Sequence, residues 1–441
     1  MEVLIEQVIF YGVAICFAVI VVIFYVIKHR RKSRETNTKI DKAKELGFHE
    51  PISLHPVVDP DMCLGSGACV AACPEKDILG LVNGRATTIN ASRCVGHGAC
   101  FHACPVQAIT LCIGTEQRGV DLPHVSPEFE TNIPGLFIAG ELGGMGLIKN
   151  AVEQGRQAVE NLKKKMKPSK ESNYDVIIVG AGPAGISATL TAANNNMRFL
   201  TLEQDSLGGT VFNFPRAKIV MTSSMNLPMH GKLKLSETSK SELLDLWVGI
   251  LAKNNISINE QEKVESIEKI NDYFRVSTNK ENYKSNSVIL CIGRRGSPRK
   301  LGVTGEEREK VAYRLLEPEL IHNQKILIVG GGDSAIESAL LLMEDNEVSI
   351  SYRSDKFSRL KPKNLNKITI ASRDKKIKLF YNSNVKEIKD KSVILQIEEK
   401  QKEIDNDLVY IFAGGELPTK FLEKIGIKID KKFGEAILKH I

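Results

Sequence analysis

The sequence predicts an α/β protein with two nested Rossmann-like units, a small α+β module and one N-terminal transmembrane helix. Three features indicate this. Twenty uncharged residues lie near the N-terminus (8–27), six cysteines fall in two short sets, and two glycine-rich turns each stand between an apolar strand and a helix. The 441 residues allow two or three domains. The net charge of +7 is too small to indicate a nucleic-acid partner.

The segment 8–27 has neither a charge nor a proline, and as a helix it is about 30 Å long, enough to cross the hydrocarbon core of a bilayer. Five basic residues follow it between positions 28 and 34. Because basic flanks stay on the cytoplasmic side, we expect residues 1–34 to be a retained single-pass anchor with its juxtamembrane stretch, in the cell inner membrane with the bulk of the chain cytoplasmic. A buried core helix is the alternative.

Two cysteine sets follow, each with the pattern C-x5-C-x3-C-P. Their thiols are Cys63, Cys69, Cys73, Cys94, Cys100 and Cys104. Clustered thiols of this kind indicate metal ligands in a reducing compartment rather than disulfides. The spacing matches the bacterial ferredoxin motif C-x2-C-x2-C-x3-C-P, except that Ser66 and His97 occupy its second cysteine position. Residues 56–115 therefore resemble a two-cluster ferredoxin domain.

This resemblance implies two iron–sulfur sites, one with Cys63, Cys69 and Cys104, the other with Cys73, Cys94 and Cys100. Each site has three thiolates where the family has four, which leaves open a [3Fe–4S] cluster, a [4Fe–4S] cluster with an oxygen or nitrogen ligand, or an exchangeable iron. Imidazole binds iron, so His97 is the stronger candidate for a fourth ligand, whereas Ser66 must lose a proton of high pKa. Either residue can instead be a polar turn residue. Zinc is the competing metal, but paired zinc sites usually show C-x2-C spacing.

The first glycine-rich turn has the pattern Gly180-x-Gly182-x-x-Gly185, after an apolar strand and before a helix. The next strand ends in Glu203. This is a dinucleotide fingerprint, in which the glycines let the backbone approach a pyrophosphate at the helix N-terminus and the acid binds ribose hydroxyls. We expect residues 174–294 to form the FAD-binding domain.

The second turn contains Gly330, Gly332 and Ala335. The strand that follows ends without a carboxylate, and Arg353 stands there instead, with Lys356 and Arg359 close by in the sequence. An arginine at this position can pair with a 2′-phosphate, which favours NADPH over NADH; the alternative is an arginine that is merely exposed. We expect residues 295–410 to bind NAD(P)H and residues 411–441 to return to the FAD domain.

Two nested dinucleotide units are similar to thioredoxin-reductase-like flavoproteins, particularly their bacillithiol-disulfide-reductase-like branch. The resemblance implies flavin contacts at Gly209 and Thr210. The family's last strand, T-x-x-P-G-x-F-A-x-G-D, is missing at the end of this chain, but a similar stretch ends upstream at Gly140 and Glu141. We interpret this as a circular permutation, in which residues 116–162 close the FAD site and a Lys-rich linker, 163–173, joins them to the rest.

Residues 205–320 contain one cysteine, Cys291, within a predicted buried strand, so the chain lacks the dithiol that disulfide reductases use. The predicted function is a membrane-tethered iron–sulfur flavoprotein oxidoreductase that passes electrons between NAD(P)H, FAD and two clusters, to or from an external partner protein or quinone-like acceptor. No side chain is assigned as a general acid or base. The alternatives are an electron-carrier subunit or redox sensor of a larger membrane complex, and a reductase that uses a partner's cysteines. The oligomeric state stays open; the resemblance implies a homodimer.

Overall fold

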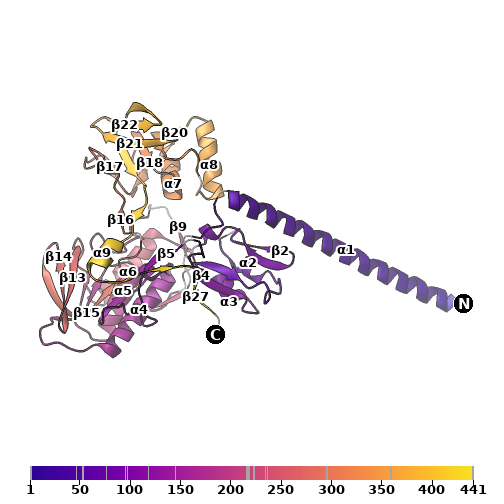
Figure 1. The fold of residues 1–441 in the computed structure, drawn as a ribbon, viewed down its shortest axis with the longest axis horizontal. Coiled ribbons are helices and arrows are strands. Elements are labelled where there is room, and N and C mark those ends of the chain that lie inside the picture. Colours follow the sequence, from indigo (N-terminus) through magenta and orange to yellow (C-terminus); the bar gives the residue numbers. More distant parts are fainter. Residues whose placement is uncertain are drawn as a thin grey trace. The chain divides into compact units, whose positions relative to one another are not determined.

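The computed structural model describes residues 2–45, 47–51, 54–75, 77–94, 96, 98–117, 119–144, 146–214, 219–221, 224–233, 235, 237–294, 296–357 and 360–439. The chain forms two compact units (Figure 1). The first unit comprises Met1–Asp121 and Lys431–Ile441, and the second comprises Leu122–Asp430.

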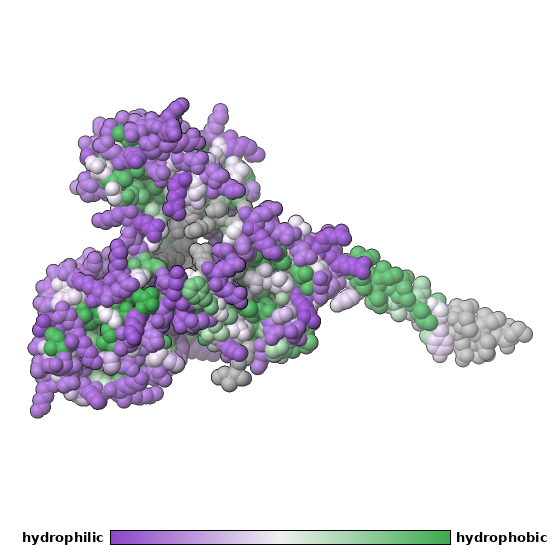
Figure 2. Space-filling model, viewed as in Figure 1, coloured by the Kyte–Doolittle hydropathy of each residue, from purple (hydrophilic) through white to green (hydrophobic). Residues whose placement is uncertain are grey.

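The first unit begins with one long helix, α1 (Glu2–Glu45). Its described span Phe10–Glu45 contains a stretch with a mean hydropathy of 2.8 that is not buried at all in the protein. Figure 2 shows apolar residues along this part of the helix and hydrophilic residues where it reaches the rest of the unit. By length and composition α1 can cross a membrane, because a helix that is apolar all round and exposed lacks the polar face of a surface helix.

The cysteine-rich part of the first unit is a small α+β module. Strand β4 (Ile109–Ile113) pairs antiparallel with β1 (His55–Val58) and with β27 (Glu435–Leu438), while β2 (Leu79–Val82) and β3 (Arg85–Thr88) form a hairpin. The two short helices, α2 (Ala68–Ala72) and α3 (Ala99–Ala103), begin after Gly67 and Gly98, both in the left-handed conformation at φ 73° and 72°.

The position of β27 differs from the expectation that residues 411–441 all return to the FAD domain. Residues up to Asp430 do belong to the second unit, but the last strand joins the sheet of the cysteine-rich module. Leu111 and Ile113 of β4 are almost fully buried, so β27 gives the second edge of this buried strand a partner for its backbone groups.

The FAD-type half of the second unit has a sheet in the order β13-β14-β15-β7-β8, with β6 also beside β15. The helix α5 follows β7, and α4 packs against α5. The bounds of these elements are β6 (Leu136–Ile138), α4 (Ile148–Lys165), β7 (Tyr174–Val179), α5 (Pro183–Asn194), β8 (Phe199–Leu202), α6 (Lys240–Lys253), β13 (Val264–Ile270), β14 (Tyr273–Thr278) and β15 (Asn282–Leu290).

The nucleotide-type half has a five-stranded parallel sheet in the order β17-β24-β18-β19-β20. The bounds are β17 (Val311–Ala312), β18 (Lys325–Val329), α7 (Asp333–Leu342), β19 (Glu347–Ser351), α8 (Pro362–Arg373), β20 (Ile377–Phe380) and β24 (Leu408–Ile411). An antiparallel sheet of β21 (Ser383–Ile388), β22 (Ser392–Ile397) and β23 (Lys400–Asp405) is inserted before β24. The chain enters this half through β16 (Ser297–Pro298) and leaves it through β25 (Gly415–Glu416), and these two crossings pair with each other, as nested domains require.

The remaining elements are short. They are η1 (Ala91–Arg93), β5 (Val120–Pro123), η2 (Glu141–Gly143), β9 (Ile219–Met221), β10 (Met225–Leu227), β11 (Gly231–Leu233), β12 (Glu237–Ser239), η3 (Pro318–Leu320), α9 (Thr419–Lys424) and β26 (Ile429–Lys432). Together these elements confirm the predicted α/β architecture of two nested dinucleotide-type domains with an α+β module and one long apolar helix.

Candidate cofactor sites

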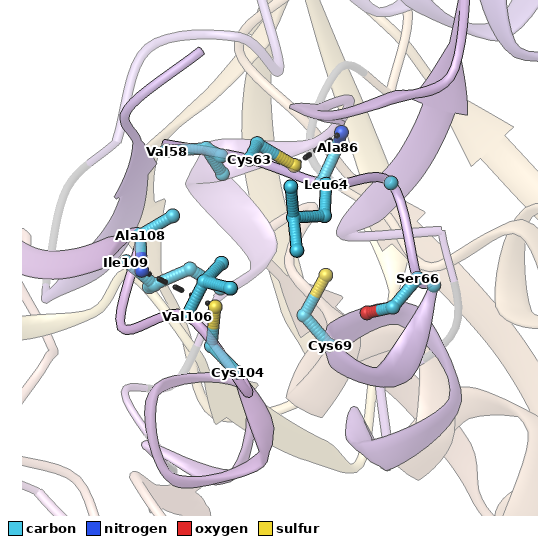
Figure 3. Close-up of a pocket in the computed structure, with 12 residues that line it drawn as sticks. Val58, Cys63, Leu64, Ser66, Cys69, Ala86, Cys104, Val106, Ala108 and Ile109 are labelled. Atoms are coloured by element: carbon cyan, nitrogen blue, oxygen red, sulfur yellow. Dashed lines mark hydrogen bonds between the residues drawn. The ribbon is translucent and has the colours of Figure 1, made fainter. Parts of the chain in front are cut away.

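The first cysteine site is a pocket where the two cysteine sets meet. Cys63 and Cys69 of the first set and Cys104 of the second set line it together, as the ferredoxin resemblance implied (Figure 3). The backbone N–H of Ala86 donates to Cys63 Sγ at 3.3 Å, and that of Ala108 donates to Cys104 Sγ at 3.2 Å. Such N–H···S bonds stabilise a sulfur that carries negative charge, so the pocket suits thiolate ligands.

The thiol groups of this pocket favour a bound cation. Burial, followed by the charges of Cys63 and Cys104, raises the pKa of the Cys69 thiol. Three thiolates this close are unfavourable without positive charge between them, and bound iron supplies that charge. The residues present therefore fit an iron–sulfur cluster.

The second site has the same chemistry. Burial and then the charges of Cys94 and Cys73 raise the pKa of Cys100 to about 12, and burial raises that of Cys94 to about 11. The backbone N–H of Gly96 donates to Cys94 Sγ at 3.4 Å. Because charges act on a thiol mainly from nearby, Cys73 and Cys94 lie near Cys100, which agrees with the second implied set.

The two candidate fourth ligands are Ser66 and His97. Ser66 lines the first pocket, and its hydroxyl accepts a hydrogen bond from the N–H of Ala68 at 3.4 Å, so it holds the turn before α2. His97 lies outside the described residues. Within the described part of the chain, no three His, Cys, Asp or Glu side chains form a site for a single metal ion.

The three glycines of the first fingerprint each meet a separate requirement. Gly180 has φ +103°, and a Cβ on Gly185 would lie 1.8 Å from the carbonyl oxygen of Gly180. Gly182 has open space where a side chain would stand. At the end of β8 the buried carboxylate of Glu203 accepts from the N–H groups of Ala181 (2.7 Å) and Asp205 (2.9 Å). This cradle fits a pyrophosphate at the start of α5 and a ribose beside Glu203.

The residues predicted to close the flavin site come to the same place. A Cβ on Gly140 would lie 3.0 Å from Cβ of Ala184 in the first turn of α5. One on Gly209, which precedes Thr210, would lie 3.2 Å from Cα of Gly182. Both loops therefore lie beside the turn that carries the first fingerprint. Glu141 follows Gly140 and begins η2.

The position of Gly140 also depends on a residue that sequence reasoning did not assign. The side-chain oxygen of Gln154 in α4 accepts from the Gly140 N–H at 2.9 Å. Gln154 lies in the helix that follows the closing strand, but no sequence motif marks this hydrogen bond. Strand β6 is parallel to β15, with Leu136 opposite Val288, so the upstream segment does occupy a place in the FAD-type sheet.

The second fingerprint has a similar form. Gly330 has φ +139°, Gly332 faces open space, and Ala335 is fully buried in the core of this domain. A Cβ on Gly331 would lie 2.3 Å from the ring of Tyr352, which stacks on Phe357. This aromatic contact was also missed.

The basic residues after β19 are only partly described. Arg353 and Lys356 are exposed, and Arg359 lies outside the described residues. Arg353 is therefore accessible to a ligand. Cys291, by contrast, is almost fully buried, and burial raises its pKa, so it is not poised for thiol exchange.

Comparison with known proteins agrees with both parts of the chain. Residues 55–105 match the 4Fe-4S dicluster domain, and residues 177–439 match the pyridine nucleotide-disulphide oxidoreductase family. Bacilliredoxin reductase of Bacillus subtilis is 28% identical over 265 residues, which is 58% of this chain and 82% of that protein. A ferredoxin–NADP reductase of Picrophilus torridus is 30% identical over 243 residues, 54% of this chain and 69% of its own length.

Among solved structures, bacillithiol disulfide reductase from Staphylococcus aureus has a TM-score of 0.50 and 26% identity, over 58% of this chain and 81% of that one. The thioredoxin-reductase-like fold is thus confirmed, as are the oxidoreductase class and the iron–sulfur module. The chain belongs to the pyridine nucleotide-disulphide oxidoreductase family and is an oxidoreductase that also carries a 4Fe-4S dicluster domain.

Proposed function

We propose that this protein is a membrane-tethered oxidoreductase that passes electrons between NAD(P)H, FAD and two iron–sulfur clusters, to or from an acceptor outside the chain. The observation that carries the proposal is covalent continuity. The segment that ends in Gly140 and Glu141 beside the α5 turn follows directly on the module that holds Cys63 to Cys104. The flavin site and the clusters therefore share one stretch of chain.

A second observation supports a route through the clusters. The second unit, Leu122–Asp430, contains one cysteine, Cys291, which is buried in the core. A single buried thiol cannot exchange with a disulfide. Ferredoxin–NADP reductases among the relatives act, by their name, with an iron–sulfur protein. We infer that here such a protein is fused to the reductase.

Bound FAD supplies the chemistry that converts a two-electron hydride transfer into one-electron transfers. The chain's own residues bind and position. Gly180, Gly182 and Gly185 let backbone N–H groups approach the pyrophosphate, and Glu203 orients the ribose. Arg353 pairs with the 2′-phosphate of NADPH in this proposal. The remaining contacts are proposed to be Gly140, Glu141, Gly209 and Thr210 at the flavin, and Gly330, Gly332 and Ala335 at the nicotinamide cofactor.

We propose the six cysteines as cluster ligands, with Ser66 or His97 in the fourth position of its own set. Ser66 faces the pocket in Figure 3, which supports its candidacy. The cluster type depends on these residues: a [3Fe–4S] centre needs neither of them, and a [4Fe–4S] centre needs a fourth ligand.

The test is iron and sulfide analysis with EPR spectroscopy of anaerobically purified full-length protein, before and after NADPH. We expect both cluster signals to change on addition of NADPH. Cys100→Ser should remove one signal, while Cys112→Ser should keep both, because Cys112 is a buried β4 residue outside the sets. Zinc in place of iron would overturn the cluster assignment, and clusters that respond to dithionite but not to NADPH would overturn the internal electron route.

A further inference from the structure

The second half of α1 lies lengthwise against the cysteine-rich module. Its first contacts come directly after the apolar part: a Cβ on Gly84 would lie 3.7 Å from Nε2 of His29. Ser33 then exchanges two hydrogen bonds with Asn83, of 3.0 and 3.2 Å, and is buried by this contact. The turn of the β2–β3 hairpin therefore lies beside the part of α1 that emerges from the apolar segment.

Farther along α1, the contacts move away from the hairpin turn. Lys39 Nζ lies 2.5 Å from Asp77 Oδ1, ahead of β2. Ala43 is buried in a small core with Phe48 and Ile89. Strand β2 therefore runs antiparallel to α1, and the module has one end beside His29–Ser33 and another beside Lys39–Ala43.

The two cysteine sites lie at these opposite ends. Near the hairpin turn, a Cβ on Gly65 would lie 1.7 Å from the carbonyl oxygen of Gly84, and Ala86 N–H donates to Cys63 Sγ. The loop of the Cys63–Cys69–Cys104 site thus packs against the turn itself.

At the other end, Asn90 donates to the carbonyl oxygen of Asp77 at 2.7 Å. The Arg93 guanidinium lies 4.4 Å from the centre of the Phe48 ring, and Cys94 follows Arg93 in the chain. The Cys73–Cys94–Cys100 site is therefore beside the end of α1.

The rise of an α-helix converts this order into heights above the membrane. Measured from Ile27, the last residue of the apolar run, His29 lies about 3 Å along the helix axis, Ser33 about 9 Å and Ala43 about 24 Å. The headgroup layer on one side of a bilayer is about 5–8 Å thick. The hairpin turn is then level with the headgroups, and the end of α1 is well outside them. Tilting the helix reduces every height in proportion and leaves the order unchanged.

The side chains at the hairpin end suit that position. Leu64 and Met62, beside Cys63, are 75% and 49% exposed. Arg31 and Arg85 are 82% and 53% exposed and lie near the carboxylates of Glu35 (3.1 Å) and Asp61 (3.6 Å). The same stretch of α1 carries four more exposed basic side chains, those of Lys28, Arg30, Lys32 and Arg34. Exposed apolar groups together with basic groups are typical of surfaces that contact anionic lipid headgroups.

We propose that the hairpin turn and the Cys63 loop form a membrane-facing surface that contacts anionic lipid headgroups. The Cys63–Cys69–Cys104 site is then the cluster nearer the bilayer, and the Cys73–Cys94–Cys100 site is about 15 Å farther away along α1. This inference rests on the membrane tether of the proposed function and makes it more specific: an acceptor held in the membrane meets the Cys63–Cys69–Cys104 site first.

The test measures the distance of each cluster from the lipid surface. Full-length protein is reconstituted in liposomes that contain anionic lipid and a lipid with a gadolinium-chelating headgroup, and spectra are recorded both before and after reduction with dithionite. The paramagnetic ion shortens the EPR relaxation time of nearby clusters, with an effect that falls steeply with distance; lanthanum is the diamagnetic control. The two signals are assigned with Cys63→Ser and Cys94→Ser, each of which should lose one of them.

We expect a large gadolinium effect on the signal that Cys63→Ser removes and a much smaller effect on the other. Inserting seven helix-forming residues between Lys28 and His29 lifts the module by about 10 Å without touching its contacts with α1, so the large effect should be lost. If the cysteine variants do not fold, this variant still tests whether one cluster lies close to the lipid surface, because two signals that do not respond to the insertion would overturn the inference. The matched control, the same insertion after the exposed Lys167, should leave the effect unchanged.

The outcomes separate this inference from the proposed function. Protein that does not float with liposomes overturns the tether and the inference with it, and protein without iron–sulfur signals overturns the cluster assignment and the inference with it. Protein that floats and has both signals, but shows equal gadolinium effects or a larger effect on the signal that Cys94→Ser removes, overturns only the inference.

Discussion

The substitution Gly155→Ala tests whether the upstream segment closes the flavin site. Gly155 lies in α4, the helix that follows the closing strand, and α4 packs against α5. A Cβ at position 155 would lie 2.1 Å from the carbonyl oxygen of Ala184, about 1.3 Å short of ordinary van der Waals contact at 3.4 Å. Because the obstacle is backbone in the first turn of α5, the helices must separate, and the pyrophosphate cradle moves with them.

The expected change in the free energy of unfolding on Gly155→Ala is the difference between two opposing effects. Glycine to alanine within a helix stabilises by about 1 kcal/mol when the site has room. Overpacking a tight interface costs about 1–3 kcal/mol, and here the obstacle is rigid backbone, so the upper part of that range applies. We therefore expect Gly155→Ala to destabilise the flavin domain by about 1–2 kcal/mol and to weaken FAD binding.

The assay follows FAD release by flavin fluorescence during urea denaturation, together with far-UV circular dichroism. Gly249→Ala is the matched control, because Gly249 lies in helix α6 with no atom within 4 Å of its Cβ position. The control should raise the urea midpoint and Gly155→Ala should lower it. If both substitutions raise the midpoint equally, α4 does not pack tightly on α5, and the interpretation of a rearranged flavin domain is refuted.

Three further predictions concern the ligands. Arg353→Ala should lower kcat/KM for NADPH by about 10–100-fold, because a charge-assisted hydrogen bond is lost, and should leave kcat/KM for NADH unchanged. The control is Arg373→Ala, at an exposed arginine beside Asp374. An equal loss of kcat/KM with both cofactors would contradict a 2′-phosphate contact. Glu203→Gln should weaken FAD binding by about 10-fold or more in equilibrium dialysis, because an amide NH2 then faces a backbone N–H that now has a carboxylate acceptor, and the loop beside the ribose shifts. Unchanged affinity would show that FAD binding does not depend on these two bonds. If Ser66 is a ligand, Ser66→Ala should convert one EPR signal to the [3Fe–4S] type. An unaltered spectrum would show that Ser66 only holds the turn, through its hydrogen bond from the N–H of Ala68.

Sequence reasoning worked best where one residue type meets a strict local requirement. Gly180 and Gly330 were identified because a positive φ and a close backbone neighbour exclude other residues. The pairing of cysteines across the two sets came from a family resemblance, and the pocket lined by Cys63, Cys69 and Cys104 agrees with it.

Contacts between different secondary-structure elements were harder to predict from the sequence. Nothing in residues 435–438 indicates that they add a strand to β4, because any short strand with apolar residues can occupy a sheet edge. The bond from Gly140 to Gln154 depends on how a helix packs rather than on a motif. His97 lies outside the described residues, so its role as a ligand stays a prediction.

The path of the chain gives a physical reason for combining these cofactors in one molecule. The chain passes from the cysteine-rich unit to the flavin unit after Asp121 and returns to it after Asp430, where β27 completes the sheet of β4. Two covalent connections restrict the separation of the units more than one linker would, so each unit meets the other at a high effective concentration. A reductase that relies on a soluble ferredoxin depends on diffusion for each encounter, and a fused module removes that dependence. If α1 also holds the module at the bilayer, the same chain links the nucleotide-binding domains to the membrane surface, and a diffusible carrier between them becomes unnecessary.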